Sequence, residues 1–118
     1  MASDPKRLSR RAYQAIREAR QTTGIAVASI TLWELAWLGE NRRILVSSSV
    51  ESFVGETISR VAVKPMTPEI TAAAVRLPAD FPKDPADRII TATALADGIP
   101  LVTADQQIRG ARIVATIW

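Results

Sequence analysis

Helix-like and strand-like stretches alternate along this 118-residue chain, and the strand-like stretches do not come in runs. Neighbouring parallel strands need a crossover connection of a dozen or more residues, which is usually a helix. Alternation of this kind is therefore typical of an α/β fold, in which helices flank a mainly parallel sheet. At this length one hydrophobic core is the default, and we expect a single domain over residues 1–118.

Helix boundaries follow from start and stop signals. Thr67 and Asp84 each precede a proline, so each is placed to cap a helix whose first turn holds that proline. Gly98 supplies a C-terminal stop, and Ser48 and Glu51 have the spacing of a capping box. We expect helices from Pro5 or Ser9 to Arg20, from Ile30 to about residue 41, from about Ser49 to Arg60, from Thr67 to about Leu77 and from Asp84 to Gly98, with strands over residues 24–29, 61–64, 99–103 and 112–117.

One of these helices, in the stretch TLWELAWLGEN, carries leucine, alanine and tryptophan on most of its circumference. A helix that is apolar all round is typically buried, so we expect this one to be largely buried. We interpret Trp33 and Trp37, one turn apart, as core or dimer-interface residues rather than as platforms for base stacking.

The chain contains no histidine and no cysteine. This excludes Ser-His and Cys-His nucleophilic catalysis, paired-histidine ribonuclease chemistry, thiolate redox chemistry and ordinary zinc sites. Carboxylate, hydroxyl, lysine and arginine chemistry remains. The sequence has neither the roughly 20 apolar residues that cross a bilayer nor an apolar segment behind its basic N-terminus, which predicts a cytoplasmic protein.

Formal net charge is +3, and twelve of the fifteen basic residues are arginine. The planar guanidinium matches phosphate oxygens in bidentate fashion, so a polyanionic partner would suit this composition. A codon bias that spreads arginine over solvated helix faces would give the same composition. The local concentrations are Arg7, Arg10 and Arg11, then Arg42 with Arg43, and any of these could line a groove for nucleic acid.

Three acids, Glu34, Asp87 and Asp105, each lie in an apolar or small-residue stretch. In a parallel α/β unit the helix begins at the carboxyl end of one strand, and the next strand finishes at that same end. Asp87 lies in the first turn of a helix, and Asp105 lies just after the strand that follows. Glu34 lies early in the helix after residues 24–29. We therefore expect all three at one edge of the sheet, where ligands of open α/β sheets bind.

Carboxylates gathered in one crevice would repel one another and raise their own pKa values unless a cation lay among them. The chain offers only hard oxygen ligands there, which favours Mg²⁺ or Mn²⁺. Each acid also has a simpler explanation: Asp87 could complement the helix dipole, Asp105 could be a turn residue, and Glu34 could pair with an arginine. Asp84 is placed to cap its helix. Thr103 could support a ligand network or simply prefer a strand.

The segments SITLWELAWL, DPADRIITATALADG and PLVTAD, in this order, resemble the PIN-domain ribonuclease toxins of the VapC family, which belong to type II toxin–antitoxin systems. The intervening MTPEITAAAVRLP and the terminal TIW extend the resemblance over nearly the whole chain. It implies a Rossmann-like parallel sheet flanked by helices and an endoribonuclease that hydrolyses RNA phosphodiester bonds with Mg²⁺ or Mn²⁺. It also implies a homodimer and a cognate VapB-type antitoxin that holds the toxin inactive.

The same motifs imply roles for individual residues. The positions that match the family's catalytic, metal-binding acids are Glu34, Asp87 and Asp105. Asp84 matches a possible outer member of the acid group, and Thr103 matches a supporting hydroxyl. Arg88, beside the acids, could contact a phosphate or form a salt bridge with a neighbouring acid, and the sequence favours neither role.

One part of the family pattern is absent from the sequence. Members open with a hydrophobic strand that ends in Asp followed by Thr or Ser, and here the corresponding region reads SDPKRLSRR. We therefore expect a PIN-like domain without its first strand, whose neighbouring strands keep unpaired edges. An alternative function follows: a catalytically inactive remnant that only dimerises or binds an antitoxin. A phospho-receiver domain is a further alternative suggested by Lys64-Pro65, but no acceptor Asp at a strand end precedes that lysine.

Overall fold

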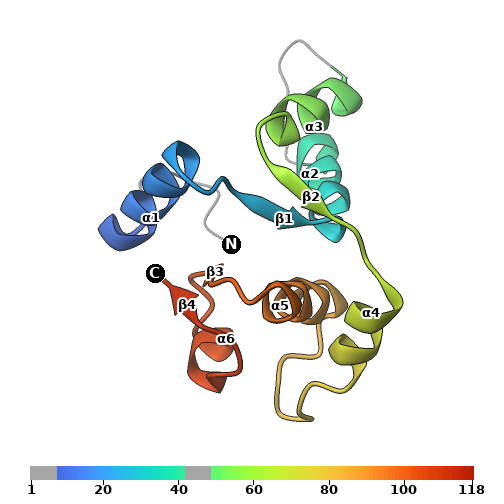
Figure 1. Ribbon diagram of the computed structural model, residues 1–118. Helices are drawn as coiled ribbons and strands as arrows, with labels where there is room; N and C mark the ends of the chain where they lie inside the picture. Colours follow the sequence, from blue (N-terminus) through green and yellow to red (C-terminus); the bar gives the residue numbers. More distant parts are fainter. Residues whose placement is uncertain (1–7, 42–48) are drawn as a thin grey trace.

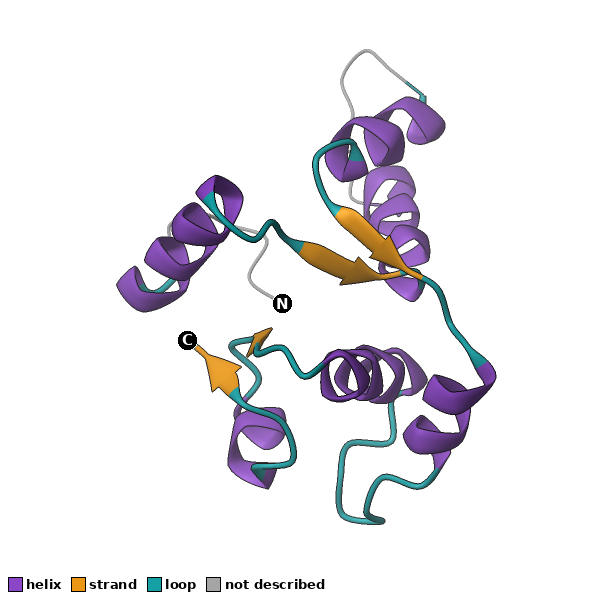
Figure 2. Cartoon of the chain, viewed as in Figure 1, coloured by secondary structure: helices purple, strands orange, loops and turns teal. Residues whose placement is uncertain are grey.

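A computed structural model of the chain describes residues 8–41 and 49–118. Helices and short strands alternate through these residues, as the sequence predicted (Figures 1 and 2). The elements are α1 (Arg10–Gln21), β1 (Ala26–Ala28), α2 (Ile30–Asn41), α3 (Val50–Ile58), β2 (Ala62–Lys64), α4 (Pro68–Val75), α5 (Pro85–Asp97), β3 (Leu101–Val102), α6 (Gln106–Ala111) and β4 (Thr116–Ile117). Within the two described ranges, no helix is long and apolar enough to cross a membrane.

In the described part of the chain the strands form two separate parallel pairs instead of one continuous sheet. β1 pairs with β2, with Val27 opposite Val63, and β3 pairs with β4, with Leu101 opposite Thr116. Figure 2 shows the two pairs as separate sets of orange arrows. The predicted α/β class with parallel strands is confirmed, whereas the single sheet that we expected is divided.

Each strand of the two pairs has an outer edge without a partner strand among the described residues. Ile25 O accepts a hydrogen bond from the backbone of β2 at 2.8 Å, and Ser29 N donates one to it at 2.9 Å. Because backbone groups of successive residues point to opposite sides of a strand, those of Ala26 and Ala28 face away from β2. Val102 faces away from β4 for the same reason. Within residues 8–41 and 49–118 these backbone groups therefore face no partner strand, and the loss of the family's first strand stays a prediction.

Side-chain caps determine where several helices begin. Ser9, Thr67 and Asp84 each accept hydrogen bonds from the backbone N–H groups of the first turn that follows. The two helix starts predicted from Thr-Pro and Asp-Pro are therefore confirmed. Gly98 ends α5 in the left-handed conformation, with a φ of 64°, which glycine adopts without strain.

Two helix starts differ from expectation. The cap of α3 is Ser49, whose Oγ accepts from Ser52 N at 3.1 Å. The capping box that we expected from Ser48 therefore begins one residue too early, and Ser48 itself lies outside the described residues. The second difference is α6, which the sequence does not predict because six residues are too few to show a helical period.

Most of the buried apolar side chains among the described residues lie in the C-terminal half. One cluster joins α4 and α5, and the other joins α6 to the segment before α5; their buried members are Ile70, Ala74 and Ala92, and Leu77, Phe81 and Ile108. In the N-terminal half only Ala12 and Ala28 reach the same degree of burial among the described apolar residues. The α4–α5 pair and the segment between its helices are therefore the main packed unit.

The expectation that α2 is largely buried is wrong for the described chain. Trp33 is 63% exposed and Trp37 is 49% exposed, so neither is a core residue. Other sides of the helix contact α3, α5 and β1. A dimer-interface role for the two tryptophans remains a prediction.

One side chain, Arg88 of α5, holds the segment between α4 and α5. Its guanidinium lies 5.8 Å from the centre of the Phe81 ring, within cation–π range. Nε donates to the carbonyl of Pro82 at 2.9 Å, and the two terminal nitrogens donate at 3.2–3.3 Å to the carbonyls of Ala74, Leu77, Pro78 and Phe81. A guanidinium has five N–H donors, so these bonds use all of them.

We expect Arg88→Lys to lower the free energy of unfolding by about 2 kcal/mol. A lysine keeps the charge but has three donors and no planar fork, so it leaves partly buried carbonyls unpaired. For a domain of this size the change corresponds to a fall of roughly 10 °C in melting temperature, which circular dichroism measures. The control is Arg109→Lys at an exposed position of α6. Equal melting temperatures for the two variants would contradict the role of Arg88.

Candidate functional site

The four acids that the sequence singled out lie near helix starts. Glu34 is in the second turn of α2, which follows β1. Asp84 caps α5, and Asp87 lies in the first turn of the same helix. Asp105 caps α6, three residues after the end of β3. Each position is the local consequence of a strand or loop that leads into a helix.

Two of the acids carry the electrostatic signature of a shared site. The pKa of Glu34 is raised above its ordinary value, mainly by burial and then by the charges of Asp87 and Asp84. The pKa of Asp87 is also raised, mainly by burial and then by the charges of Asp84 and Asp105. The structure therefore brings acids from α2, α5 and α6 close enough to repel one another.

Asp84 and Asp105 also have a structural task. One carboxylate oxygen of Asp84 accepts from two backbone N–H groups of α5, at 2.8 and 3.2 Å. The Oδ1 atom of Asp105 does the same for α6, at 2.8 and 3.1 Å. The predicted capping role of Asp84 is confirmed, and Asp105 is a helix cap rather than a simple turn residue. In both acids these bonds use only one of the two oxygens.

Thr103 supports the position of Asp105. Its Oγ1 accepts a hydrogen bond from Asp105 N at 3.1 Å, which fixes the turn between β3 and α6. The hydroxyl therefore acts on the backbone of the acid. Any role in a ligand network remains a prediction.

The carboxylates of the four acids suit a hard divalent cation, but as spaced in the described residues they do not surround one. The acids offer only carboxylate oxygens, which Mg²⁺ and Mn²⁺ prefer, and their mutual repulsion is the condition that a cation relieves. Among residues 8–41 and 49–118, however, no three acids lie close enough together to hold a metal ion jointly. The chemistry of the group fits a metal ion, and the described geometry lacks a closed cage.

Arg88 has neither of the roles considered from the sequence. All five of its donors bind backbone carbonyls, so none is left for a phosphate or a carboxylate. The ion pair found among the described residues joins Lys64 and Asp97 at 3.5 Å instead. The signal that was overlooked is the segment LPADFP, whose loop carbonyls need donors from elsewhere in the fold. Arg88 therefore positions Asp84 and Asp87 by holding the segment in front of them.

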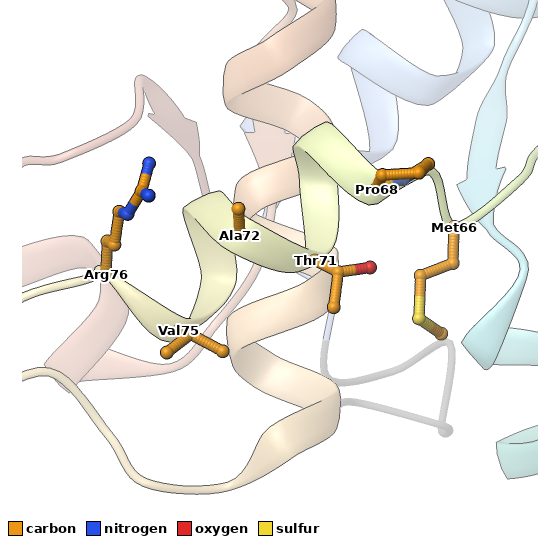
Figure 3. Close-up of a pocket in the computed structure, with 6 residues that line it drawn as sticks. All are labelled: Met66, Pro68, Thr71, Ala72, Val75 and Arg76. Carbon is orange, nitrogen blue, oxygen red and sulfur yellow. The ribbon is translucent and has the colours of Figure 1, made fainter.

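One hollow on the described surface lies away from the acids. It has a volume of about 600 Å³, is open to solvent, and lies along α4 and the residues just before it (Figure 3). Its lining is mainly apolar and consists of Met66, Pro68, Thr71, Ala72, Val75 and Arg76. Nothing in this lining offers the carboxylate chemistry of the acid group.

Burial and repulsion predict how Glu34 affects stability as pH changes. Because its folded pKa is raised, the folded chain holds more protons than the unfolded chain just above the ordinary pKa, so stability falls as pH rises through this window. Glu34→Gln removes this contribution. We expect the variant to melt at a higher temperature than the wild type at neutral pH. The difference should vanish at about pH 3, where Glu34 is protonated and, like the glutamine that replaces it, carries no charge.

Thermal unfolding between these pH values, in excess chelator, measures the effect. Glu56→Gln, an exposed position of α3, is the control and should show no comparable gain. A Glu34→Gln variant that melts below the wild type at neutral pH would contradict the repulsion.

Comparison with known proteins agrees with this arrangement. The profile of the PIN domain family matches residues 2–113. Ribonuclease VapC22 of Mycobacterium tuberculosis is 43% identical over 119 aligned positions, which cover 99% of this chain and 89% of that protein. Among solved structures, the crystal structure of VapBC2 from Rickettsia felis bound to a DNA fragment from their promoter includes a similar chain. The two structures superpose with a TM-score of 0.68, and the alignment covers 88% of this chain and 81% of the other. Because the sequences are only 18% identical, this similarity concerns the fold alone.

The family match and the relative each span nearly the whole chain, and the solved structure has a similar fold. The chain belongs to the PIN-domain family, and within it to the VapC group.

Proposed function

We propose that this chain is the toxin of a type II toxin–antitoxin pair, an endoribonuclease that hydrolyses RNA phosphodiester bonds with Mg²⁺ or Mn²⁺. The observation that carries the proposal is the mutual repulsion of half-buried acids that come from separate helices. Stability alone disfavours such an arrangement, whereas a cation site requires it. The relative named as a ribonuclease, 43% identical over 99% of this chain, supports the same reaction class.

Within this proposal Glu34, Asp87 and Asp105 hold the metal ion, and Asp84 is an outer member of the group. A bound divalent cation lowers the pKa of a coordinated water and stabilises charge on a phosphoryl group, so no protein nucleophile is needed. This suits a chain without histidine or cysteine. Thr103 orients Asp105 through its backbone, and Arg88 fixes the start of α5 that carries Asp87.

The proposed partners are an RNA substrate, a cognate VapB-type antitoxin and a second copy of the chain. Exposed tryptophans on α2 support a protein partner, because Trp33 and Trp37 leave apolar rings in water on the side of the helix that its neighbours do not cover. Burial of these rings against another chain would remove that cost.

We expect the purified chain to cleave single-stranded RNA with Mg²⁺ or Mn²⁺ and to stop in excess chelator. Asp87→Asn keeps the shape of the residue but removes a charged ligand, so cleavage should fall at least about 100-fold. Asp97→Asn, at the other end of the same helix, is the matched control and should retain activity. Gel analysis of labelled RNA measures both. Cleavage that persists in chelator, or an equal loss in both variants, would contradict the proposal.

A second candidate function is binding without cutting. The observation in its favour is that, in the described part of the chain, no three acids are close enough to share a metal ion. Metal binding can be tested apart from cleavage, because a cation that relieves the repulsion stabilises the folded chain by mass action. We expect Mg²⁺ or Mn²⁺ to raise the melting temperature of the wild type and not of Glu34→Gln. Absence of both the shift and cleavage would favour the non-enzymatic function.

A further inference from the structure

The outward face of α1 carries a stripe of cations around one aromatic ring. Arg10, Tyr13, Arg17 and Arg20 are all exposed, and Tyr13 is 56% exposed. Their spacings of three and four residues place them within an arc of about 80° on the helix surface. We call these four residues the α1 stripe. Of the arginines noted near the N-terminus, Arg10 belongs to this stripe, which continues along the helix to Arg20.

The opposite face of α1 is turned toward the protein. Ala12 is fully buried and Ala15, Ile16 and Ala19 are half-buried, so the apolar side of the helix is covered at least in part. α1 contacts β4 and stands at one side of the molecule (Figure 1). The α1 stripe consequently faces away from the packed side and into solvent.

Ion pairs and side-chain hydrogen bonds among the described residues do not account for the arginines of the α1 stripe. No arginine of the stripe forms an ion pair or a side-chain hydrogen bond with residues 8–41 or 49–118. Arg10 and Arg11 occupy the first turn of the helix, where the dipole favours acids. Arg10, Arg17 and Arg20 repel one another along the face. Arg20 lies in the last turn, where the dipole favours a cation, but Arg10 at the first turn and the repulsion along the face oppose helix stability on an exposed surface. Such local conflicts are characteristic of functional sites.

We propose that the α1 stripe binds the backbone and one base of single-stranded RNA, a proposal that rests on the function proposed above. Guanidinium groups suit phosphate oxygens, and an exposed aromatic ring among cations provides a stacking platform for a base. Arg10 and Arg20 are separated by ten residues, or about 15 Å along the helix axis. An RNA segment of about four stacked nucleotides has a similar length.

The distribution of apolar residues on α1 also favours RNA over an anionic membrane as the partner of the α1 stripe. A helix that binds a lipid surface buries an exposed apolar face among the lipids. Here the apolar face of α1 is turned toward the protein, with Ala12 fully buried, and the exposed face is polar. The stripe therefore has charge for a polyanion and a ring for a base, without the apolar surface that a membrane needs.

Binding can be measured without cleavage by fluorescence anisotropy of labelled oligouridine in excess chelator. The test variant is Arg10→Gln/Arg17→Gln/Arg20→Gln, and Arg60→Gln/Arg76→Gln/Arg109→Gln is a control that removes the same charge from other exposed positions. We expect the test variant to bind roughly 10-fold or more weakly than the control. Because each phosphate contact on a single strand contributes about 0.7 to the slope of log affinity against log salt, the slope should fall by about 2.

Two further variants separate folding from binding. Arginine and glutamine have similar helix propensities, so the helical signal of the test variant should be unchanged. Arg10→Lys/Arg17→Lys/Arg20→Lys keeps the charge and should retain most of the salt slope. Tyr13→Ala should weaken binding by about 5-fold or more with no change in slope, because stacking does not release counterions, and Tyr13→Phe should restore it.

Several outcomes would overturn the assignment. The first is equal affinity of the test and control variants for oligouridine. The second is a wild type that fails to bind oligouridine at low salt. The third is a wild type that binds oligoglutamate as tightly as oligouridine of the same charge. If the test variant lost binding to phosphatidylserine vesicles to a greater extent than binding to oligouridine, the stripe would be assigned to membranes instead. Because all binding is measured in chelator, failure of metal-dependent cleavage does not affect this result, and the two proposals are tested separately.

Discussion

The arrangement of the candidate site depends on the guanidinium of Arg88. Four of the five carbonyls that Arg88 binds belong to the α4–α5 connection, which contains Pro78 and Pro82, and the fifth belongs to Ala74 of α4. Arg88 supplies five donors in a planar fork from the first turns of the next helix, so the loop is folded onto the helix that it leads into. Asp84 and Asp87 lie at that junction, so their positions depend on the same interaction. A side chain beside an acid group thus contributes by fixing backbone rather than by touching substrate.

The acids themselves combine structural and chemical tasks. Asp84 and Asp105 each use one carboxylate oxygen to begin a helix, which stabilises the fold and leaves the second oxygen outside those bonds. Glu34 and Asp87 are half-buried, and repulsion raises their pKa values, which opposes stability. Helix capping explains why two of the acids are where they are, and it does not explain why the other two lie beside them.

The pattern of apolar residues predicted burial correctly on α1 and incorrectly on α2. On α1 the apolar and charged residues separate cleanly, so the sequence indicates both the packed face and the free one. On α2 apolar residues occupy almost every side, and the pattern predicted burial all round. Trp33 and Trp37 are nevertheless exposed, because hydrophobicity shows that burial would be favourable and does not show that a neighbour is present to provide it.

Local signals in the sequence determined the helix starts at Thr67 and Asp84, the stop at Gly98, the parallel α/β class, and the gathering of acids near helix starts. These features depend on capping, backbone conformation and chain direction, which act over a few residues or a single crossover. Tertiary structure alone decided that the strands divide into two pairs, that Arg88 binds carbonyls rather than an anion, and that the acids approach without closing around a cation. Each of these outcomes depends on which distant groups compete for the same hydrogen bonds and space.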